Sequence, residues 1–270
     1  MRIGNKEFDL NNHCYIMGIL NVTPDSFSDG GKWNDLDRAK AHVADMIAEG
    51  ADIIDIGGES TRPGHIQITV QEEIDRVVPY IKMVKANFDV PVSIDSYKSD
   101  VVEAALQAGA DMVNDIWGLK YDRRVADLIA GYDVPCCLMH NRETAEYDDF
   151  AADMFCDMRE TLAIAKEAGI RDGQIILDPG VGFGKNYEHN LIAIDRLEEL
   201  CGLGYPVLLA TSRKSVIGTA LDLPTDQRVE GTLATTVMGV IKGAVFVRVH
   251  DIKENYRAIR MTEAILREGK

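Results

Sequence analysis

The sequence predicts a (β/α)8 barrel in which residues 1–270 form a single domain. The length suits this class, because one such barrel takes about 250 residues. Hydrophobic residues make up 46% of the chain, which is enough for one large core. The other two observations are a series of eight short apolar runs and the polar residues that follow each run.

The apolar runs recur along the chain at the spacing of a repeated βα unit. Their polar ends lie 19 to 38 residues apart, and a βα unit takes about 30 residues, or fewer where its helix is short. The runs are continuously apolar, as expected of parallel strands covered on both faces. They span 15–20, 53–56, 92–94, 112–113, 136–139, 175–177, 207–210 and 245–247, and end at Asn21, Glu59, Asp95, Asn114, His140, Asp178, Arg213 and Arg248.

Segments with helical periodicity separate these runs. Apolar residues recur at i, i+4, i+7 and i+8 within 39–47, and a longer stretch within 70–84 continues the pattern. Glycines follow such segments, where a helix end accepts a left-handed residue. These glycines are Gly50, Gly109, Gly131, Gly169 and Gly243.

An open, doubly wound sheet is the alternative arrangement of eight parallel strands. Such sheets commonly carry a glycine-rich phosphate loop after the first strand, whereas residues 21–25 here read NVTPD. Polar residues also end every run, not only those beside one crevice. Because a barrel rim uses all eight strand ends, the barrel is favoured.

Composition limits which classes of binding partner and which cellular compartment we expect. The net charge of −15 argues against nucleic-acid and anionic-membrane partners, which need a basic face. No signal-peptide core and no apolar run of membrane-spanning length are present. The five cysteines form no C-x-x-C pair, so we expect mostly buried thiols and a cytoplasmic protein.

The glycine-rich run 180–185 (GVGFGK) is similar to two nucleotide-binding motifs but matches neither. It is not a phosphate-binding Walker loop, because Pro179 stands where that loop needs glycine and Asn186 where it needs Ser or Thr. It is not G-x-G-x-x-G either. Taken alone, it indicates only that the backbone passes close to a ligand or to a packed element.

Three strand-end residues, Asp95, Asn114 and Asp178, suggest a binding pocket. Each one alone is often a helix cap or a turn former. Together at one rim, carboxylates and an amide suit a flat heteroaromatic ring with adjacent N–H donors. Lys214 is a candidate donor to the ring's acceptors, or else a solvated surface lysine.

A second group of strand-end residues is basic and suggests an anion site. It comprises Arg62, Arg213, Arg248 and His250. Barrels frequently hold phosphate near the loops after strands seven and eight, and strands one, two and eight adjoin when the sheet closes. Any one of these arginines alone suits a surface ion pair, and Asp55 and Glu59 suit structural roles. Asn21 is a candidate Mg²⁺ ligand where phosphate and water complete the shell.

Two long polar loops, 23–31 and 60–69, are candidate lids over a substrate. The first begins with Thr23, Pro24, Asp25, Ser26 and Phe27. Ordinary mobile surface is the alternative interpretation.

With these residues laid out, the chain closely resembles the dihydropteroate synthase family from about residue 15 to 260. The segments that carry the resemblance are 17–31 (MGILNVTPDSFSDGG), 58–64 (GESTRPG), 94–96 (IDS), 114–116 (NDI), 178–185 (DPGVGFGK), 212–215 (SRKS) and 248–251 (RVHD). The first two together are highly specific.

The resemblance implies a homodimeric cytoplasmic transferase of folate biosynthesis, inhibited by sulfonamides that mimic 4-aminobenzoate. It would join dihydropterin pyrophosphate to 4-aminobenzoate and release pyrophosphate. By the same resemblance, Asp95, Asn114, Asp178, Lys214 and Met139 line the pterin pocket. Asn21, Arg62, Arg248 and His250 hold Mg²⁺-pyrophosphate. Thr61, Pro63, Phe183 and Ser212 form the 4-aminobenzoate wall.

The chain departs from the family pattern in three places. Ser96 and Ser99 stand where Thr and Pro are common, and Trp117 stands where a small residue is common. Residues 139–143 (MHNRE) replace a segment with a second Met and a Gly/Pro-rich stretch, so the resemblance assigns no role to His140.

The arylamine of 4-aminobenzoate is neutral at pH 7, so the barrier lies in breaking the bond to pyrophosphate. We therefore expect a dissociative substitution in which pyrophosphate leaves first. A corrinoid-dependent methyltransferase and a non-catalytic pterin-binding protein are the alternatives. Segments 23–31 and 60–64 argue against the first, and the intact Arg62, Lys214, Arg248 and His250 argue against the second.

Overall fold

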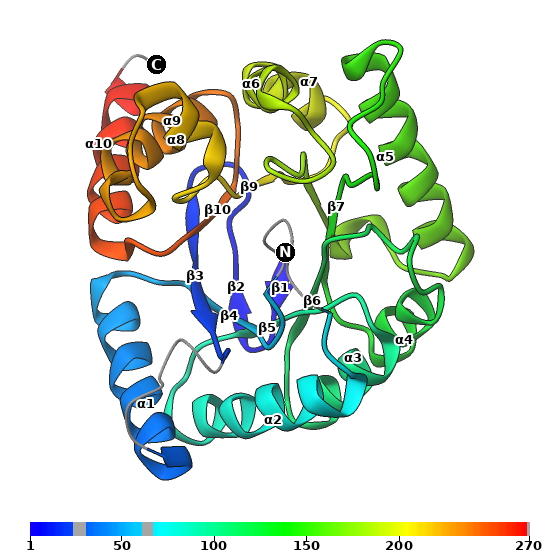
Figure 1. Cartoon of the computed structure of the whole chain (residues 1–270), viewed down its shortest axis with the longest axis vertical. Coiled ribbons are helices and arrows are strands. Elements are labelled where there is room, and N and C mark those ends of the chain that lie inside the picture. Colours follow the sequence, from blue (N-terminus) through cyan, green and yellow to red (C-terminus); the bar gives the residue numbers. More distant parts are fainter. Residues whose placement is uncertain (24–30, 61–66, 269–270) are drawn as a thin grey trace.

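The computed structural model describes residues 1–23, 31–60 and 67–268. Its eight central strands form one parallel sheet ringed by helices (Figure 1). The strands are β3 (Tyr15–Asn21), β4 (Ile53–Gly57), β5 (Val92–Asp95), β6 (Met112–Asp115), β7 (Cys136–Met139), β8 (Ile175–Asp178), β9 (Leu208–Leu209) and β10 (Phe246–Val249). Each strand overlaps one of the predicted apolar runs. Where a strand continues beyond its run, it does so by one or two residues.

The strand order shows that the sheet closes on itself. It runs β8-β7-β6-β5-β4-β3-β10-β9, and every neighbouring pair is parallel. The two ends meet through a parallel bridge between Leu177 and Val207, and the Leu177 amide donates to the Pro206 carbonyl over 2.9 Å. The barrel prediction is confirmed, and β3 does lie between β4 and β10 as the sequence required.

Helices follow the strands and cover the outside of the barrel. They are α1 (Gly31–Glu49), α2 (Val70–Asn87), α3 (Ser99–Gln107), α4 (Arg124–Tyr132), α5 (Phe150–Glu167), α6 (Tyr187–Asp195), α7 (Leu197–Cys201), α8 (Ser215–Leu221), α9 (Val229–Ile241) and α10 (Ile252–Glu268). Short 3-10 turns occupy Asp172–Gln174 and Thr225–Gln227.

Local sequence signals explain where several helices begin and end. The Thr69 hydroxyl accepts from the Glu72 amide at the start of α2, and Asp149 caps α5 in the same way. The prediction that Gly131 follows a helix is wrong. Gly131 lies inside α4, and Asp133, at φ 57°, is the left-handed residue that ends it.

The thiol prediction holds for three of the five cysteines. Cys14, Cys136 and Cys137 are buried, Cys201 is half-buried and Cys156 is exposed. All five are free thiols. Among the described residues, no helix is both long and apolar enough to cross a bilayer.

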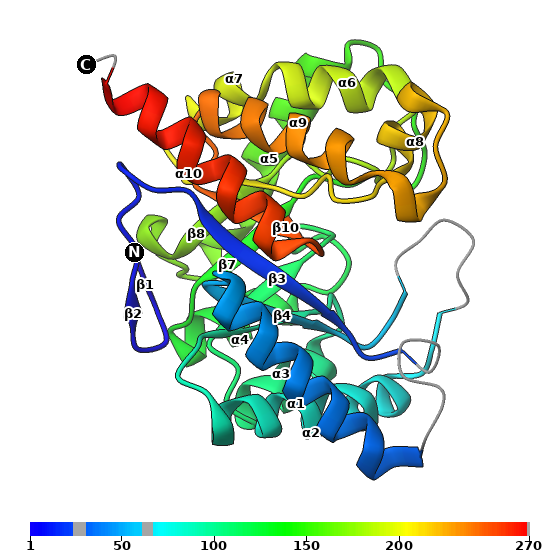
Figure 2. The same ribbon diagram turned by 90° about the vertical axis from the view of Figure 1, so that its left-hand side faces the viewer.

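An N-terminal hairpin that the sequence analysis missed closes one end of the barrel. Strands β1 (Arg2–Ile3) and β2 (Lys6–Glu7) pair antiparallel. Figure 2 shows them at the end away from the carboxyl tips of the central strands. Phe8, which follows the hairpin, packs edge-on against Tyr15 at 4.8 Å between ring centroids and also contacts Phe246. The hairpin thus completes an apolar floor inside the barrel.

Truncating Phe8 tests this floor. Its ring is only 3% exposed, so we expect Phe8→Ala to lower the free energy of unfolding by about 3 kcal/mol through lost burial and a residual cavity. Urea denaturation measures the change. Tyr132→Ala, which removes an aromatic ring that is 42% exposed on α4, is the control and should change it by less than about 0.5 kcal/mol. Equal losses in the two variants would contradict the assignment.

Candidate active site

On four strands the interior of the barrel changes from apolar to polar in a single step. Side chains two residues apart on a strand point to the same face. On these strands an apolar residue of the floor is followed two positions later by a polar residue, as in Ile53 and Asp55, Met112 and Asn114, Ile176 and Asp178, and Phe246 and Arg248. This ring of polar side chains lies directly above the floor at the carboxyl ends of the strands.

Arg248 is the centre of the polar ring. Its Nε donates to Asp55 Oδ2 and its Nη2 to Asp95 Oδ2, both over 2.6 Å. Asn114 Nδ2 donates to the same Asp55 oxygen over 3.1 Å. Strand pairing sets this geometry, because Asp95 lies beside both Gly57 and Asn114 in the ladder. One guanidinium thus holds residues from β4, β5 and β10 together.

Asp55 is a site residue whose position the sequence analysis underrated. It was considered structural, yet its side chain is fully buried beneath the pocket. Its Oδ1 is buried and has no hydrogen-bond partner among the described residues. Ser93, which lies beside Asp55 in the ladder, likewise has a buried Oγ without a hydrogen-bond partner among them. A carboxylate inside an otherwise apolar run (IIDI) is the signal that would have found it.

Asp178 and Lys214 form the opposite side of the ring. Asp178 Oδ1 accepts from the Gly180 amide over 2.7 Å, and Lys214 Nζ donates to the Val181 carbonyl. Burial raises the pKa of Asp178, against the opposing charge of Lys214. Burial also lowers the pKa of Lys214 to about 8, although Asp178 opposes the shift. Asp178 is buried and Lys214 is half-buried, so water weakens their polar contacts to a ligand less than it would at the surface.

The pKa of Asp95 is raised to about 7. Burial is the largest cause, the Arg248 guanidinium opposes it, and the neighbouring carboxylate of Asp55 adds to it. A carboxyl group in this setting exchanges its proton near neutral pH and is sensitive to donors or positive charge brought by a ligand.

Apolar side chains line the mouth next to the polar ring. Met139 and Ile116 are buried, and Trp117 and Phe183 pack against them. Met139 pairs with Asp178 in the ladder, so a thioether lies beside that carboxylate. The Phe183 ring lies below Lys214, with Nζ 4.8 Å from the ring centroid. A flat ring fits this combination of apolar walls and hydrogen-bonding edge.

Residues after β9 and β10 form the rim. Ser212 Oγ is 3.0 Å from His250 Nδ1 and accepts from the His250 amide over 3.1 Å. Arg213 is left-handed at φ 58° and makes a two-pronged ion pair with Asp251, so its charge is already matched. Asn21 ends β3 beside Gly57. Predicted residues from strands one, seven and eight therefore do gather at one end of the barrel.

Several predicted residues fall outside the described part of the chain. These are Pro24, Asp25, Ser26 and Phe27 of the first loop and Thr61, Arg62 and Pro63 of the second. Glu59, which ends its strand just before the second loop, pairs with the buried Lys98, which is also 2.8 Å from Glu73. That pairing agrees with the structural role considered for Glu59.

Within residues 1–23, 31–60 and 67–268, no cluster of three His, Cys, Asp or Glu side chains is arranged to hold a metal. Asn21 offers one hard oxygen ligand at the rim. This donor set fits Mg²⁺ that takes most of its ligands from phosphate and water, as Mg²⁺ commonly does.

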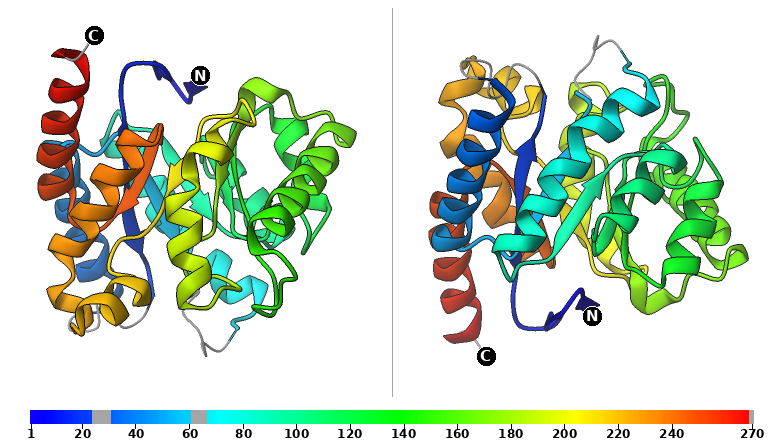
Figure 3. Two further views of the ribbon diagram at one scale, coloured as in Figure 1. Left: turned by 90° about the horizontal axis from the view of Figure 1, so that it is seen from above. Right: turned by 90° about the horizontal axis from the view of Figure 1, so that it is seen from below.

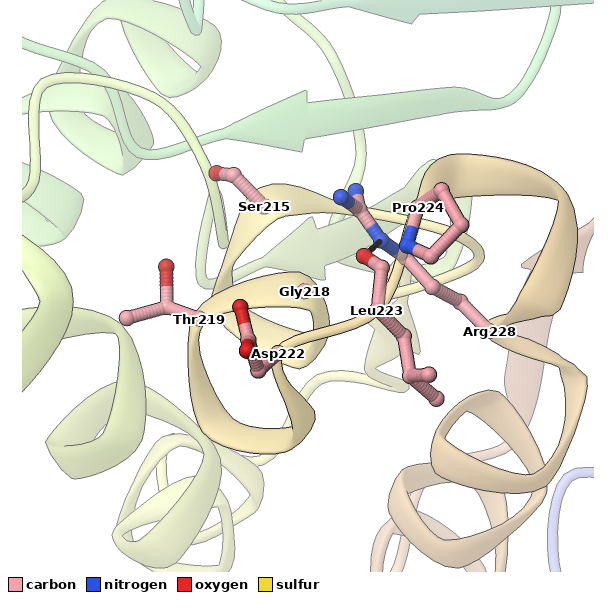
Figure 4. A pocket seen from close by; sticks show the side chains of 7 residues that line it. All are labelled: Ser215, Gly218, Thr219, Asp222, Leu223, Pro224 and Arg228. Atoms are coloured by element: carbon pink, nitrogen blue, oxygen red, sulfur yellow. Dashed lines mark hydrogen bonds between the residues drawn. The ribbon is translucent and has the colours of Figure 1, made fainter.

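A hollow of about 570 Å³ lies beside α8, away from the polar ring, and none of the predicted site residues lines it (Figure 4). Its only arginine, Arg228, donates to the carbonyls of Leu223 and Arg213 over 3.0 Å each. The guanidinium therefore braces the turn that carries Arg213 and Lys214.

Comparison with known proteins agrees with this geometry. The profile of the pterin binding enzymes matches residues 17–250. A dihydropteroate synthase of Clostridium beijerinckii is 59% identical over 268 residues, which cover 99% of this chain and 100% of the relative.

Two solved structures show the same architecture. The dihydropteroate synthase of Clostridium difficile, determined in the presence of pteroic acid, has a TM-score of 0.94 and 53% identity and covers 97% of this chain and 100% of its own. That of Xanthomonas albilineans with 4-aminobenzoic acid has a TM-score of 0.90 and 40% identity, covering 95% and 94%.

The chain belongs to the family of pterin binding enzymes. Within that family, both the sequence relative and the solved structures place it among the dihydropteroate synthases, which are transferases. The resemblance seen in the sequence is thereby confirmed.

The raised pKa of Asp95 makes stability depend on pH. An unfolded aspartate ionises near pH 4, whereas this one keeps its proton to about pH 7. Between these values the folded state binds more protons than the unfolded state, so the free energy of unfolding falls as pH rises. We expect Asp95→Asn to reduce this decline, measured by urea denaturation from pH 4 to 8, while the buried Asp115 and Asp178, whose pKa values burial also raises, account for the remainder. Parallel profiles for wild type and variant would contradict the pKa shift.

Proposed function

We propose that the chain condenses (7,8-dihydropterin-6-yl)methyl diphosphate with 4-aminobenzoate to give 7,8-dihydropteroate and pyrophosphate. The observation that carries this proposal is the polar ring of Asp55, Asp95, Asn114, Asp178 and Lys214 above an apolar floor. Its carboxylates accept the pterin's N–H donors, and Lys214 donates to the pterin's acceptors. Met139 borders the pterin ring, and Phe183 borders the 4-aminobenzoate.

The reaction proceeds by departure of pyrophosphate before attack of the arylamine. Asp95 and Asp178 favour positive charge on the pterin methylene, and loops 23–31 and 60–69, acting as lids, exclude water that would capture the cation. Arg62 and His250 bind the leaving group. Ser212, with Thr61 and Pro63, borders the 4-aminobenzoate.

Arg248 has a double role in this proposal. It was expected to contact pyrophosphate, and its guanidinium is also engaged by Asp55 and Asp95 beneath the pterin. It therefore orients the two carboxylates that meet the ring and adds positive charge below the departing diphosphate.

Mg²⁺ suits this site, with Asn21 as the protein ligand and pyrophosphate oxygens and water as the rest of the shell. Bound there, the ion would supply positive charge to the leaving group. The proposed substrates are small molecules, and the proposal includes no nucleic-acid or membrane partner. We also propose that the protein is cytoplasmic.

A coupled assay of pyrophosphate release tests the function. Sustained release over many turnovers should require dihydropterin pyrophosphate, 4-aminobenzoate and Mg²⁺ together, should stop on addition of a chelator, and should be inhibited by a sulfonamide in competition with 4-aminobenzoate. Because pyrophosphate departs first, a single turnover without 4-aminobenzoate agrees with the proposal. Sustained release without 4-aminobenzoate, or no release under any condition, would overturn it.

Replacing Asp178 tests the pterin pocket. We expect Asp178→Ala to lower turnover at least about 10²-fold, because a transition-state contact in a dry site is lost. Asp195→Ala, which removes a carboxylate that is 77% exposed, is the matched control. Near-normal turnover of Asp178→Ala would rule out its assignment.

We also propose a homodimer joined through α9 and α10, which pack side by side (Figure 3). Exposed apolar side chains gather on this pair, namely Met238, Ile241, Met261, Ile265 and Leu266. Such clustering marks an interface more often than scattered exposed residues do.

Charge placed on this surface should separate the subunits. We expect Ile265→Glu to convert a dimer to a monomer in light scattering, because a buried unpaired carboxylate is costly. Leu191→Glu, on α6 and 42% exposed, should leave the dimer intact. A wild-type monomer, or a dimer that tolerates Ile265→Glu, would argue against this interface.

A further inference from the structure

Lys185 ends the GVGFGK run, and nothing in the proposed reaction uses it. Its Nζ is 2.8 Å from His140 Nδ1, 3.0 Å from the Phe183 carbonyl and 3.3 Å from the His140 carbonyl. Burial lowers the pKa of Lys185 to about 7, against the opposing charge of Asp178. In its protonated form the group has three N–H donors, and three acceptors already surround it. Lys185 is therefore bound within the protein and is not placed as a phosphate ligand.

His140 is the main partner of Lys185 and is itself held from behind. Its fully buried ring lies with Nε2 3.0 Å from Asp157 Oδ2 on α5. Because Lys185 donates to Nδ1, the neutral tautomer with hydrogen on Nε2 satisfies both contacts. Burial lowers the pKa of His140 to about 4, so the ring is neutral at pH 7.

Asp157 also accepts from Arg142 Nε over 2.6 Å. Although burial acts in the other direction, the hydrogen bonds from His140 and Arg142 hold the pKa of Asp157 well below its usual range. The carboxylate is thus a fixed negative charge that keeps the imidazole in one orientation.

The glycines of the run explain why this anchoring matters. A Cβ at Gly180, where φ is 70°, would lie 1.9 Å from the His140 carbonyl oxygen. A Cβ at Gly184, where φ is 53°, would lie 2.3 Å from the Arg142 carbonyl oxygen. The backbone of 180–184 therefore rests directly on the segment after β7, and Lys185 ties the two together.

The other side of this turn faces the candidate site. Its Val181 carbonyl accepts from Lys214 Nζ, and its Phe183 ring lies under the same ammonium. Asp157, His140 and Lys185 thus form a continuous chain of contacts from α5 to the residues that border the arylamine. The pterin edge at Asp55, Asp95 and Asn114 is held separately by Arg248.

We infer that Lys185, oriented through His140 by Asp157, is a positioning residue that sets the affinity for 4-aminobenzoate by holding Phe183 in place beside Lys214. This inference rests on the proposed function. In this inference the GVGFGK run and the segment after β7 act together to position Phe183. Neither segment needs to bind phosphate or to contact the pterin directly.

The test uses Lys185→Met, Asp157→Asn and the double variant in the full-length protein. Each single variant should raise the KM for 4-aminobenzoate on the order of tenfold, because misplacing a substrate wall is costly without loss of chemistry. The double variant should be no worse than the poorer single one, since both break one chain of contacts. Lys166→Met, at an exposed position on α5, is the matched control and should leave that KM unchanged.

Two further measurements separate positioning from general damage. Calorimetry with dihydropterin pyrophosphate alone should show an unchanged dissociation constant, and urea denaturation should confirm that the variants are folded. If Lys185→Met does not fold, Asp157→Asn carries the test, because its side chain is 18% exposed.

An unchanged KM for 4-aminobenzoate, an equal loss of pterin affinity, or additive effects in the double variant would each overturn the inference. Wild-type turnover is measured first. A wild type that makes no dihydropteroate overturns the proposed function and this inference with it, whereas an active wild type with unaffected variants overturns this inference alone.

Discussion

The contact on which the rest of the site depends is the guanidinium of Arg248 between Asp55 and Asp95. Three strands that are far apart in sequence each contribute one member. Removing one partner of a buried ion pair leaves an uncompensated charge, which typically costs about 3–5 kcal/mol. Loss of one member of this group should therefore destabilise the barrel as well as change the candidate site.

The barrel makes this arrangement possible by separating its interior into two levels. Below Arg248, the floor is closed by the N-terminal hairpin and excludes water. Above it, every polar group lies at the carboxyl end of a strand, where loops bring further residues over the same opening. Burial at this level raises the pKa of Asp95 and lowers that of Lys214, although Arg248 and Asp178 respectively oppose the shifts.

A second chain of contacts reaches the pocket from outside the sheet. It starts on α5, passes through a neutral imidazole and ends at Phe183. In the proposed function, the first system orients the groups that meet the pterin and the second shapes the wall beside the 4-aminobenzoate. Since the two systems share no residue, the proposal predicts that the contacts to one substrate can change without disturbing those to the other.

Eight apolar runs, their spacing and the helical segments between them were enough to predict the barrel, because continuously apolar strands that alternate with helices are typical of a parallel sheet covered on both faces. Strand-end residues such as Asp95, Asn114 and Asp178 could be predicted as neighbours, because parallel strands deliver their ends to one rim. Asp55, by contrast, lies within an apolar run, and only closure of the sheet brings Arg248 to it from 193 residues away. The same holds for Lys185 and Asp157. Their roles depend on which backbone rests on which, and side-chain contacts between distant segments are decided by tertiary packing.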